Sequence, residues 1–85
     1  MTYRIEFVTS AAKEFRALDQ VIKRRVTSTI ESLRQEPRST DVRKLLGHQN
    51  LYRIRVGVYR IVYEIDDQAK LIRVTRIRHR RDVYR

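Results

Sequence analysis

Hydrophobic and polar residues alternate most regularly between residues 51 and 65. This period of two is typical of strands, and it divides the segment into Leu51–Val56 and Tyr59–Ile65 on either side of a two-residue turn that begins with Gly57. The aliphatic and aromatic positions share one predicted face: Tyr52, Ile54, Val56, Tyr59, Ile61, Tyr63 and Ile65. The opposite face carries Arg53, Arg55 and Arg60. A sheet that buries its apolar face therefore presents guanidinium groups to solvent.

The first part of the chain predicts one strand followed by two helices. Tyr3–Val8 alternates as a strand, and a short helix is predicted over Ala11–Leu18. A longer apolar stripe at helical spacing predicts a second helix over Gln20–Gln35, which Pro37 ends. The candidate N-caps are Thr9 and Ser10 for the first helix and Asp19 for the second.

Leu71–His79 is the last predicted strand, although its pattern is irregular. Strict alternation would place Val74 on the same face as Arg76 and Arg78. We therefore expect a bulge or twist that re-aims these residues. The order of strand, two helices and three-strand meander predicts an α+β fold, in which a helical hairpin covers one face of a mainly antiparallel sheet. A chain of 85 residues is expected to form one domain, residues 1–85.

The charge of the chain is strongly positive and unevenly distributed. The formal net charge is +10, sixteen of the twenty cationic residues are arginine, and residues 41–85 hold twelve cations against five anions. A basic surface favours an acidic partner, and arginine binds phosphate through planar, two-point contacts, so nucleic acid is the first candidate. The alternative is a generally basic surface that keeps the protein soluble.

Composition also limits the kinds of site that the chain can form and its expected location in the cell. With no cysteine and two histidines, the chain lacks the ligands of an ordinary structural zinc site, and it has no glycine-rich phosphate loop. No stretch approaches the roughly 20 apolar residues of a membrane span, and the N-terminus has no signal-peptide pattern. We therefore expect a cytoplasmic protein that needs no metal or other cofactor and binds no membrane.

The predicted hairpin brings like charges together. A two-residue turn at Gly57 pairs Arg55 with Arg60 across the two strands, roughly 5 Å apart at Cβ. Two cations in this arrangement repel each other, and a bound anion would relieve the repulsion. The alternative is that each arginine pairs with a carboxylate such as Glu64.

A second concentration of candidate residues lies in residues 73–85, which hold six arginines, His79 and Tyr84 against one acid. Histidine ordinarily titrates near neutral pH, so His79 is the candidate proton shuttle. Tyr84 could donate a proton or stack on a nucleobase. Because RNA carries its own nucleophile in the 2′-OH, such residues are sufficient for cleavage without a metal. The alternative is a solvated tail.

Three segments together resemble the RelE/ParE superfamily of toxins from toxin–antitoxin operons, and the RelE branch most closely. They are KLLG at residues 44–47, LYRIRVGVYRIVYEI at residues 51–65 and HRRDVY at residues 79–84. The resemblance spans nearly the whole chain, including its length and its order of elements. It implies a small cytoplasmic toxin that enters the ribosomal A site and cuts mRNA by attack of a 2′-OH on the adjacent phosphodiester, leaving a 2′,3′-cyclic phosphate. The implied partners are a cognate antitoxin, the ribosome with its mRNA, and operator DNA that is bound only by the toxin–antitoxin complex.

The resemblance also implies catalytic and RNA-binding roles for particular residues of this chain. In RelE members the two positions that match Arg53 and Arg55 are lysines, one of which is proposed as the general base. Arginine stays protonated and is a poor base, so the base is left unassigned. The predicted catalytic residues are Arg55, Arg60, His79, Arg80 and Tyr84. The predicted RNA-binding residues are Arg53, Lys44, Arg76, Arg78 and Arg81.

Two other functions remain open at this stage. The ParE branch shares the fold but poisons DNA gyrase, and it needs no nuclease site. A nucleic-acid-binding module, or an inactive toxin kept as half of a repressor pair, would bind in a salt-dependent manner without cleavage. The density of arginine, histidine and tyrosine between residues 53 and 84 favours the nuclease.

Overall fold

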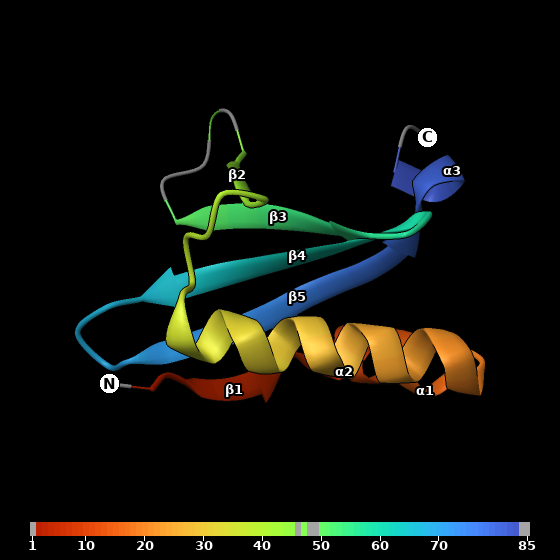
Figure 1. Cartoon of the computed structure of the whole chain (residues 1–85), viewed down its shortest axis with the longest axis horizontal. Coiled ribbons are helices and arrows are strands. Elements are labelled where there is room, and N and C mark those ends of the chain that lie inside the picture. The colour runs from red at the N-terminus through yellow and green to blue at the C-terminus, as the bar shows by residue number, and fades with distance from the viewer. Residues whose placement is uncertain (1, 46, 48–49, 84–85) are drawn as a thin grey trace.

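A five-stranded sheet forms the frame of the structure, and two helices cover one of its faces (Figure 1). The computed structural model describes residues 2–45, 47 and 50–83, with Asp82 and Val83 as backbone only. Its elements are β1 Arg4–Phe7, α1 Thr9–Arg16, α2 Gln20–Gln35, β2 Arg43–Lys44, β3 Leu51–Val56, β4 Tyr59–Asp66, β5 Leu71–His79 and α3 Arg80–Val83. The strand order is β1-β5-β4-β3-β2, in which β1 is parallel to β5 and every other neighbouring pair is antiparallel. The predicted α+β architecture is confirmed.

Helices α1 and α2 place their apolar sides against the same face of the sheet. Ala11 from α1 is buried, as are Val26, Ile30 and Leu33 from α2. The strands contribute the buried residues Tyr52, Ile54, Val56, Ile61, Tyr63, Ile65, Ile72, Val74 and Ile77 to the same cluster. The helical stripe and the alternating strand positions therefore meet in one core. None of the described helices is long and apolar enough to cross a membrane.

The two helices begin in different ways. Asp19, the predicted cap of α2, accepts a hydrogen bond from the Ile22 backbone N–H at 3.0 Å. In α1, Thr9 and Ser10 are already helical, and the N-cap residue is Val8, which makes no side-chain cap bond. The predicted capping of α1 by Thr9 or Ser10 is therefore wrong, because the helix begins at Thr9, one residue earlier than a cap at Thr9 requires and two earlier than a cap at Ser10 requires.

The β3–β4 hairpin has the predicted register and turn. Arg55 pairs with Arg60, as expected for a two-residue loop. Gly57 has a φ of 59°, whereas Val58 does not have a positive φ, which is the pattern of a type II′ turn. A Cβ at residue 57 would also lie 3.0 Å from Nη1 of Arg25, so both the backbone and the available space favour glycine here.

Strand β5 contains a β-bulge at the place where its sequence pattern is irregular. Thr75 has no partner in β4, because Arg76 and Val74 pair with consecutive residues of that strand. The extra residue reverses the alternation, so Ile77 follows Val74 into the core. Arg76 and Arg78 consequently lie on the opposite face. The strict alternation that placed these arginines with Val74 is wrong, and the expected bulge is the reason.

Two short elements were not predicted. Strand β2 pairs only two residues with β3, with Arg43 opposite Arg53. Helix α3 is a single turn after β5, and the Arg80 backbone N–H donates to the Val58 carbonyl at 2.6 Å. Both elements are too short to produce a period of two or of 3.6 residues in the sequence.

Candidate nucleic-acid interface

The sheet face away from α1 and α2 carries arginine on four neighbouring strands. We call it the arginine face, and its members are Arg43, Arg53, Arg55, Arg60, Arg76 and Arg78. The register aligns Arg55, Arg60 and Arg78 as consecutive partners across β3, β4 and β5. Arg43 and Arg53 start a second row, which Arg76 continues on the far side of Val62. Because neighbouring strands are about 4.8 Å apart, these positive charges are held close together.

Arg55 and Arg60 differ in their access to solvent. Arg55 is exposed, whereas Arg60 is only 6% exposed. The alternation therefore gives the correct face for Arg60, but the prediction that its guanidinium is offered outward is wrong. Arg60 lies on the central strand β4, between Arg55 on β3 and Arg78 on β5.

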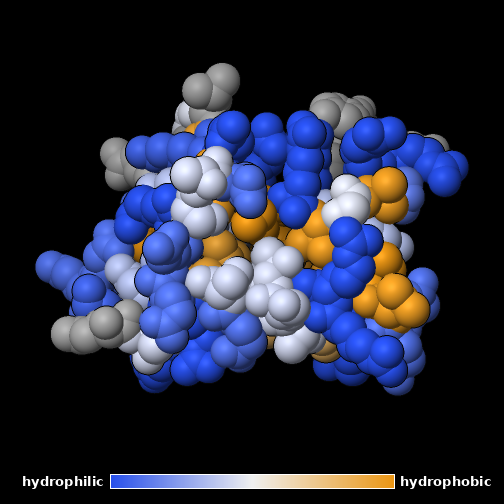
Figure 2. Space-filling view, viewed as in Figure 1, coloured by the Kyte–Doolittle hydropathy of each residue, from blue (hydrophilic) through white to orange (hydrophobic). Residues whose placement is uncertain are grey.

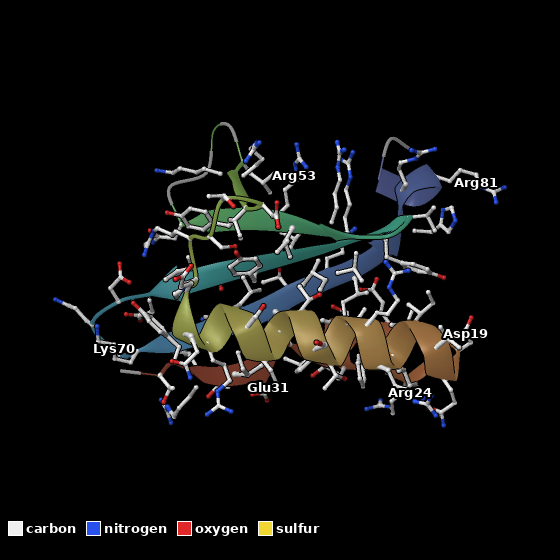
Figure 3. The ribbon with its side chains drawn as sticks, viewed as in Figure 1. Asp19, Arg24, Glu31, Arg53, Lys70 and Arg81 are labelled. Carbon is white, nitrogen blue, oxygen red and sulfur yellow. The ribbon has the colours of Figure 1, made fainter. Side chains whose placement is uncertain are left out.

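A pocket of about 370 Å³ lies beside this row. It is lined by Asp41, Arg43, Arg53 and Arg55, so it spans β2, β3 and the residue before β2. Hydrophilic side chains gather along this edge of the molecule in Figure 2, over β2, β3 and α3. Figure 3 shows Arg53 projecting from β3 on the side away from α2. The pocket is thus a cationic hollow in the arginine face.

Carboxylates neutralise another part of the same face. Glu64, the candidate partner of the hairpin arginines, instead lies 3.3 Å from Nη1 of Arg73, and Glu6 approaches Nε of Arg73 at 3.8 Å. Within the described residues, neither Arg43 nor Arg55 forms an ion pair. The unneutralised charge therefore lies toward the β2–β3 edge.

Glu14 of α1 fixes the end of β5 and orients Arg78. Its Oε2 accepts a hydrogen bond from Nε of Arg78 at 2.9 Å, and its Oε1 accepts one from the Ile77 backbone N–H at 2.7 Å. Strand β1 pairs with β5 only as far as Val74. Helix α1 therefore supplies an acceptor where β1 has ended, and Arg78 is drawn toward that edge of the sheet.

His79 lies on the opposite side of the sheet from the arginine face. It pairs with Tyr59 across β4 and β5, and the two rings meet edge to face with centroids 5.3 Å apart. Nδ1 of His79 accepts a hydrogen bond from the Arg81 backbone N–H at 3.1 Å. The ring lines a separate hollow of about 320 Å³ between α1 and β5. The structure therefore does not bring His79 together with Arg55, as the sequence analysis expected.

The remaining predicted residues lie at the edge of the sheet or beyond it. Lys44 is exposed and pairs with Tyr52, so it belongs to the helix side rather than the arginine face. Arg80 and Arg81 are exposed in α3, and Figure 3 shows Arg81 pointing away from the sheet. Tyr84 lies outside the described residues.

Two residues of this region were not identified from the sequence. Arg43 sits in a polar connection, and only its pairing with β3 places it beside Arg53. Glu14 contacts residues more than sixty positions away in the chain. The sequence does place Glu14 within the predicted helix Ala11–Leu18, next to the apolar Phe15. Helical periodicity, however, does not predict which residues of another segment the Glu14 carboxylate contacts.

The arrangement can bind phosphates, but it offers little acid–base chemistry. Guanidinium groups stay protonated and form charge-assisted, two-point bonds with phosphate oxygens. The described part of the arginine face carries no histidine, cysteine or tyrosine. Among the described residues, no group of three or more histidine, cysteine, aspartate or glutamate side chains is placed to hold a metal ion.

The sequence and the fold both match known toxins over almost their whole length. The family model for the ParE toxin of the type II toxin–antitoxin system parDE matches residues 5–84. Toxin RelG of Mycobacterium tuberculosis is 30% identical over 89 residues, covering 100% of this chain and 99% of RelG. The mRNA interferase toxin RelE of Escherichia coli K12 is 28% identical over 88 residues, covering 99% of this chain and 92% of RelE.

A solved structure gives the same result. A chain in the archaeal RelE–RelB complex from Pyrococcus horikoshii OT3 superposes with a TM-score of 0.80 at 32% identity, covering 94% of this chain and 97% of the other. The match spans nearly the entire chain, so it includes the sheet. The chain therefore belongs to the ParE toxin family and is a RelE-type toxin of a type II toxin–antitoxin system.

Proposed function

We propose that this toxin is a ribosome-dependent endonuclease that cuts mRNA in the A site. The observation that carries the proposal is the row of Arg55, Arg60 and Arg78, held in register across three strands next to a cationic pocket. The name of the Escherichia coli relative, an mRNA interferase, points to the same class of reaction. The 2′-OH of one nucleotide attacks the adjacent phosphorus, the 5′-oxygen leaves, and a 2′,3′-cyclic phosphate forms.

The arginines on β3 and β4 have different roles in this proposal. Arg55 is exposed and contacts a non-bridging oxygen of the scissile phosphate. Arg60 is buried directly across from it and contributes a fixed positive charge in a site of low dielectric, where such a charge acts more strongly than in water. Arg53 positions the strand of RNA, two residues along β3 from Arg55. The negative charge that develops on phosphorus is therefore stabilised by groups that need no reorganisation.

Proton transfer is assigned to a group other than His79. The His79 ring packs on Tyr59 on the helix side of the sheet, away from Arg55. Cleavage by this chain then depends on placing the 2′-OH in line and on stabilising charge. The 2′-OH proton passes to water, and Tyr84, a candidate from the sequence alone, protonates the leaving 5′-oxygen. Arg80 and Arg81, exposed in α3, are proposed to bind RNA or ribosomal phosphates beyond the scissile linkage.

The proposed partners follow from the same family. A cognate antitoxin neutralises the toxin, as the RelE–RelB pairing in the Pyrococcus horikoshii complex suggests. The ribosome presents the mRNA, and operator DNA is bound only by the toxin–antitoxin complex. The reaction takes place in the cytoplasm, where translation occurs.

The proposed function is tested by mapping transcripts after induction of the toxin. Primer extension should find cuts within codons of translated mRNA, and these cuts should vanish when translation initiation is blocked. Arg55→Gln should lower cleavage on programmed ribosomes by about 10²-fold, by analogy with the loss of one preorganised anion donor. Arg24→Gln is the matched control, because it removes the same charge from α2, on the opposite side of the molecule from Arg53 in Figure 3.

Two results would contradict the proposal. Cuts that persist without translation would remove the dependence on the ribosome. Gyrase-dependent DNA breaks with intact transcripts would instead support the second candidate function, a toxin that poisons DNA gyrase. This candidate is tested because the matched family model is named for the ParE toxin.

A further inference from the structure

We propose that the pocket lined by Asp41, Arg43, Arg53 and Arg55 is a second phosphate subsite, which binds a backbone phosphate adjacent to the scissile one. We call it the β2 subsite. The inference rests on the proposed nuclease function and extends it to a residue, Arg43, that the sequence analysis did not identify. The ligand is a phosphodiester of single-stranded RNA.

Local structure holds Arg43 in place for this role. Its Nη1 donates to the carbonyl oxygens of Thr40 at 2.8 Å and Val42 at 3.1 Å. Pairing of β2 with β3 sets Arg43 directly opposite Arg53. The guanidinium is therefore anchored through one nitrogen by two neutral acceptors, which fix its position without neutralising its charge. An exposed arginine that serves only solubility has no need of such anchoring.

The charge of the pocket favours an anion. Three guanidinium groups and one carboxylate, that of Asp41, line a volume of about 370 Å³. Within the described residues, Asp41 forms no ion pair with Arg43 or Arg55. Like charges facing each other across a strand pair are destabilising on their own. A phosphate offers oxygens to several guanidinium groups at once and offsets this repulsion.

The position of the pocket relative to the row suits a polynucleotide rather than a free ion. Arg55 belongs both to the pocket and to the row with Arg60. Arg53 lies two positions along β3, which separates the Cα atoms of Arg53 and Arg55 by about 6.7 Å. Two anion sites that share Arg55 along one strand can engage successive phosphates of one RNA strand. The β2 subsite therefore contributes binding energy at a distance from the reacting phosphorus.

The first test measures binding of a fully 2′-O-methylated RNA hexamer, which cannot be cut, to the whole protein. Arg43→Gln should weaken binding several-fold and reduce the slope of log Kd against log salt by about 0.7, the value for one single-strand phosphate contact. Asp41→Asn should tighten binding, because it removes the carboxylate from the pocket. Arg24→Gln, which makes the same change of net charge outside the pocket, should leave the slope unchanged. Far-UV circular dichroism confirms that each variant is folded.

The second test separates the subsite from the reaction. On programmed ribosomes, Arg43→Gln should raise KM with little change in kcat, since a contact made equally before and in the transition state affects binding alone. Arg55→Gln should lower kcat.

The outcomes distinguish the two proposals. If Arg43→Gln and Arg24→Gln bind the hexamer equally, the β2 subsite is refuted, whether or not the toxin cleaves mRNA. If hexaglutamate competes as well as RNA does, the pocket is an acidic-peptide site and the assignment to RNA is overturned. If wild-type protein binds RNA through Arg43 but cuts no transcript, the nuclease proposal fails, and with it the claim that the bound phosphate neighbours a scissile one.

Discussion

Tyr63 illustrates how a single polar atom is accommodated in the core of a small domain. The residue is fully buried in β4, and its hydroxyl donates to the carbonyl oxygen of Pro37 at 2.8 Å. Burial raises the pKa of Tyr63 well above its ordinary value, so the hydroxyl remains a donor throughout the range in which the protein is folded. The bond attaches the turn after α2 to the central strand.

Tyr63→Phe should lower the free energy of unfolding by about 1–2 kcal/mol, because the buried Pro37 carbonyl loses its donor. Urea denaturation monitored by circular dichroism measures this difference. Tyr59→Phe is the matched control, since Tyr59 is only half-buried and no described residue hydrogen-bonds its hydroxyl. Equal stability of the Tyr63→Phe variant and the wild-type protein would show that water replaces the lost donor.

The position of His79 gives a second expectation for a single residue. Because its ring packs on Tyr59 on the helix side, His79→Gln should change kcat for mRNA cleavage by no more than about twofold, well below the loss expected for a general base. The pH–rate profile between about pH 6 and 8 should keep its shape. A loss of about 10²-fold, together with loss of an inflection in this range, would place the histidine in the reaction after all.

Among the elements, α1 does more than cover the sheet. Strand β1 ends opposite Val74, so the last part of β5 has no strand on that side. Glu14 replaces the missing neighbour by accepting from the Ile77 N–H and from Arg78. One carboxylate thus determines both the course of β5 and the direction of an arginine in the candidate site.

Glu14→Gln keeps the shape of the side chain but removes its charge and one of its two acceptors, because the amide NH2 cannot accept from Arg78 or from the Ile77 N–H. The free energy of unfolding should fall by about 1–2 kcal/mol. Mobility of Arg78 should increase, which is measurable by NMR as faster exchange of its Nε–Hε proton with water. Glu31→Gln is the control, because Glu31 forms an exposed ion pair with Arg34 within α2 and should be worth little. If both substitutions have the same small effect, the contact of Glu14 does not organise β5.

The elements that sequence predicts well are those whose signal is local and long. The bounds of α2, β3 and β5 agree with the structure, and the hairpin register follows from Gly57. Strand β2 could not be predicted, because two residues carry no period and their strand character comes from pairing with β3. Helix α3 is equally short.

The candidate site is predicted less completely, because it depends on contacts between distant segments. Alternation gives the correct face for Arg53, Arg55 and Arg60, yet it contains no information on how deeply a central strand is covered. The bulge moved Arg76 and Arg78 onto the arginine face and left His79 on the other. Sequence indicated an irregularity in β5 but could not place it at Thr75.

At the scale of the whole molecule, the carboxylates are distributed so that one region keeps its positive charge. Five of the ten acidic residues form ion pairs in the described structure: Glu6, Glu14, Glu31, Glu64 and Asp67. Their partners lie on α2, on the connection after it and on β5. Arg43 and Arg55 form none among the described residues. The β2–β3 edge therefore keeps part of the positive charge of the chain, and this charge would attract nucleic acid.

The end of the molecule away from α3 is held by a polar network around Asp67. Its Oδ1 accepts from the Tyr3 hydroxyl at 2.6 Å, and both oxygens accept from the Arg38 guanidinium, at 3.2 and 2.9 Å. Arg38 also donates to the Tyr52 hydroxyl at 3.2 Å. The network joins the N-terminus, the connection after α2 and the β4–β5 turn.

Acid should weaken this network in a defined pH range. The Arg38 guanidinium, and then the Tyr3 hydroxyl, lower the pKa of Asp67 from 3.8 to about 2. Because the folded state favours the carboxylate, the contribution of Asp67 to stability is complete above the pKa of the unfolded state and is lost as the pH falls through the pKa of the folded state.

The difference in unfolding free energy between wild type and Asp67→Asn should therefore be constant above about pH 5 and shrink toward about pH 2. Asp66→Asn is the control, since among the described residues the Asp66 side chain hydrogen-bonds only the Ala69 backbone N–H, and its substitution should change the unfolding free energy less. A difference between wild type and Asp67→Asn that is independent of pH would mean that Asp67 acts through packing rather than through its charge.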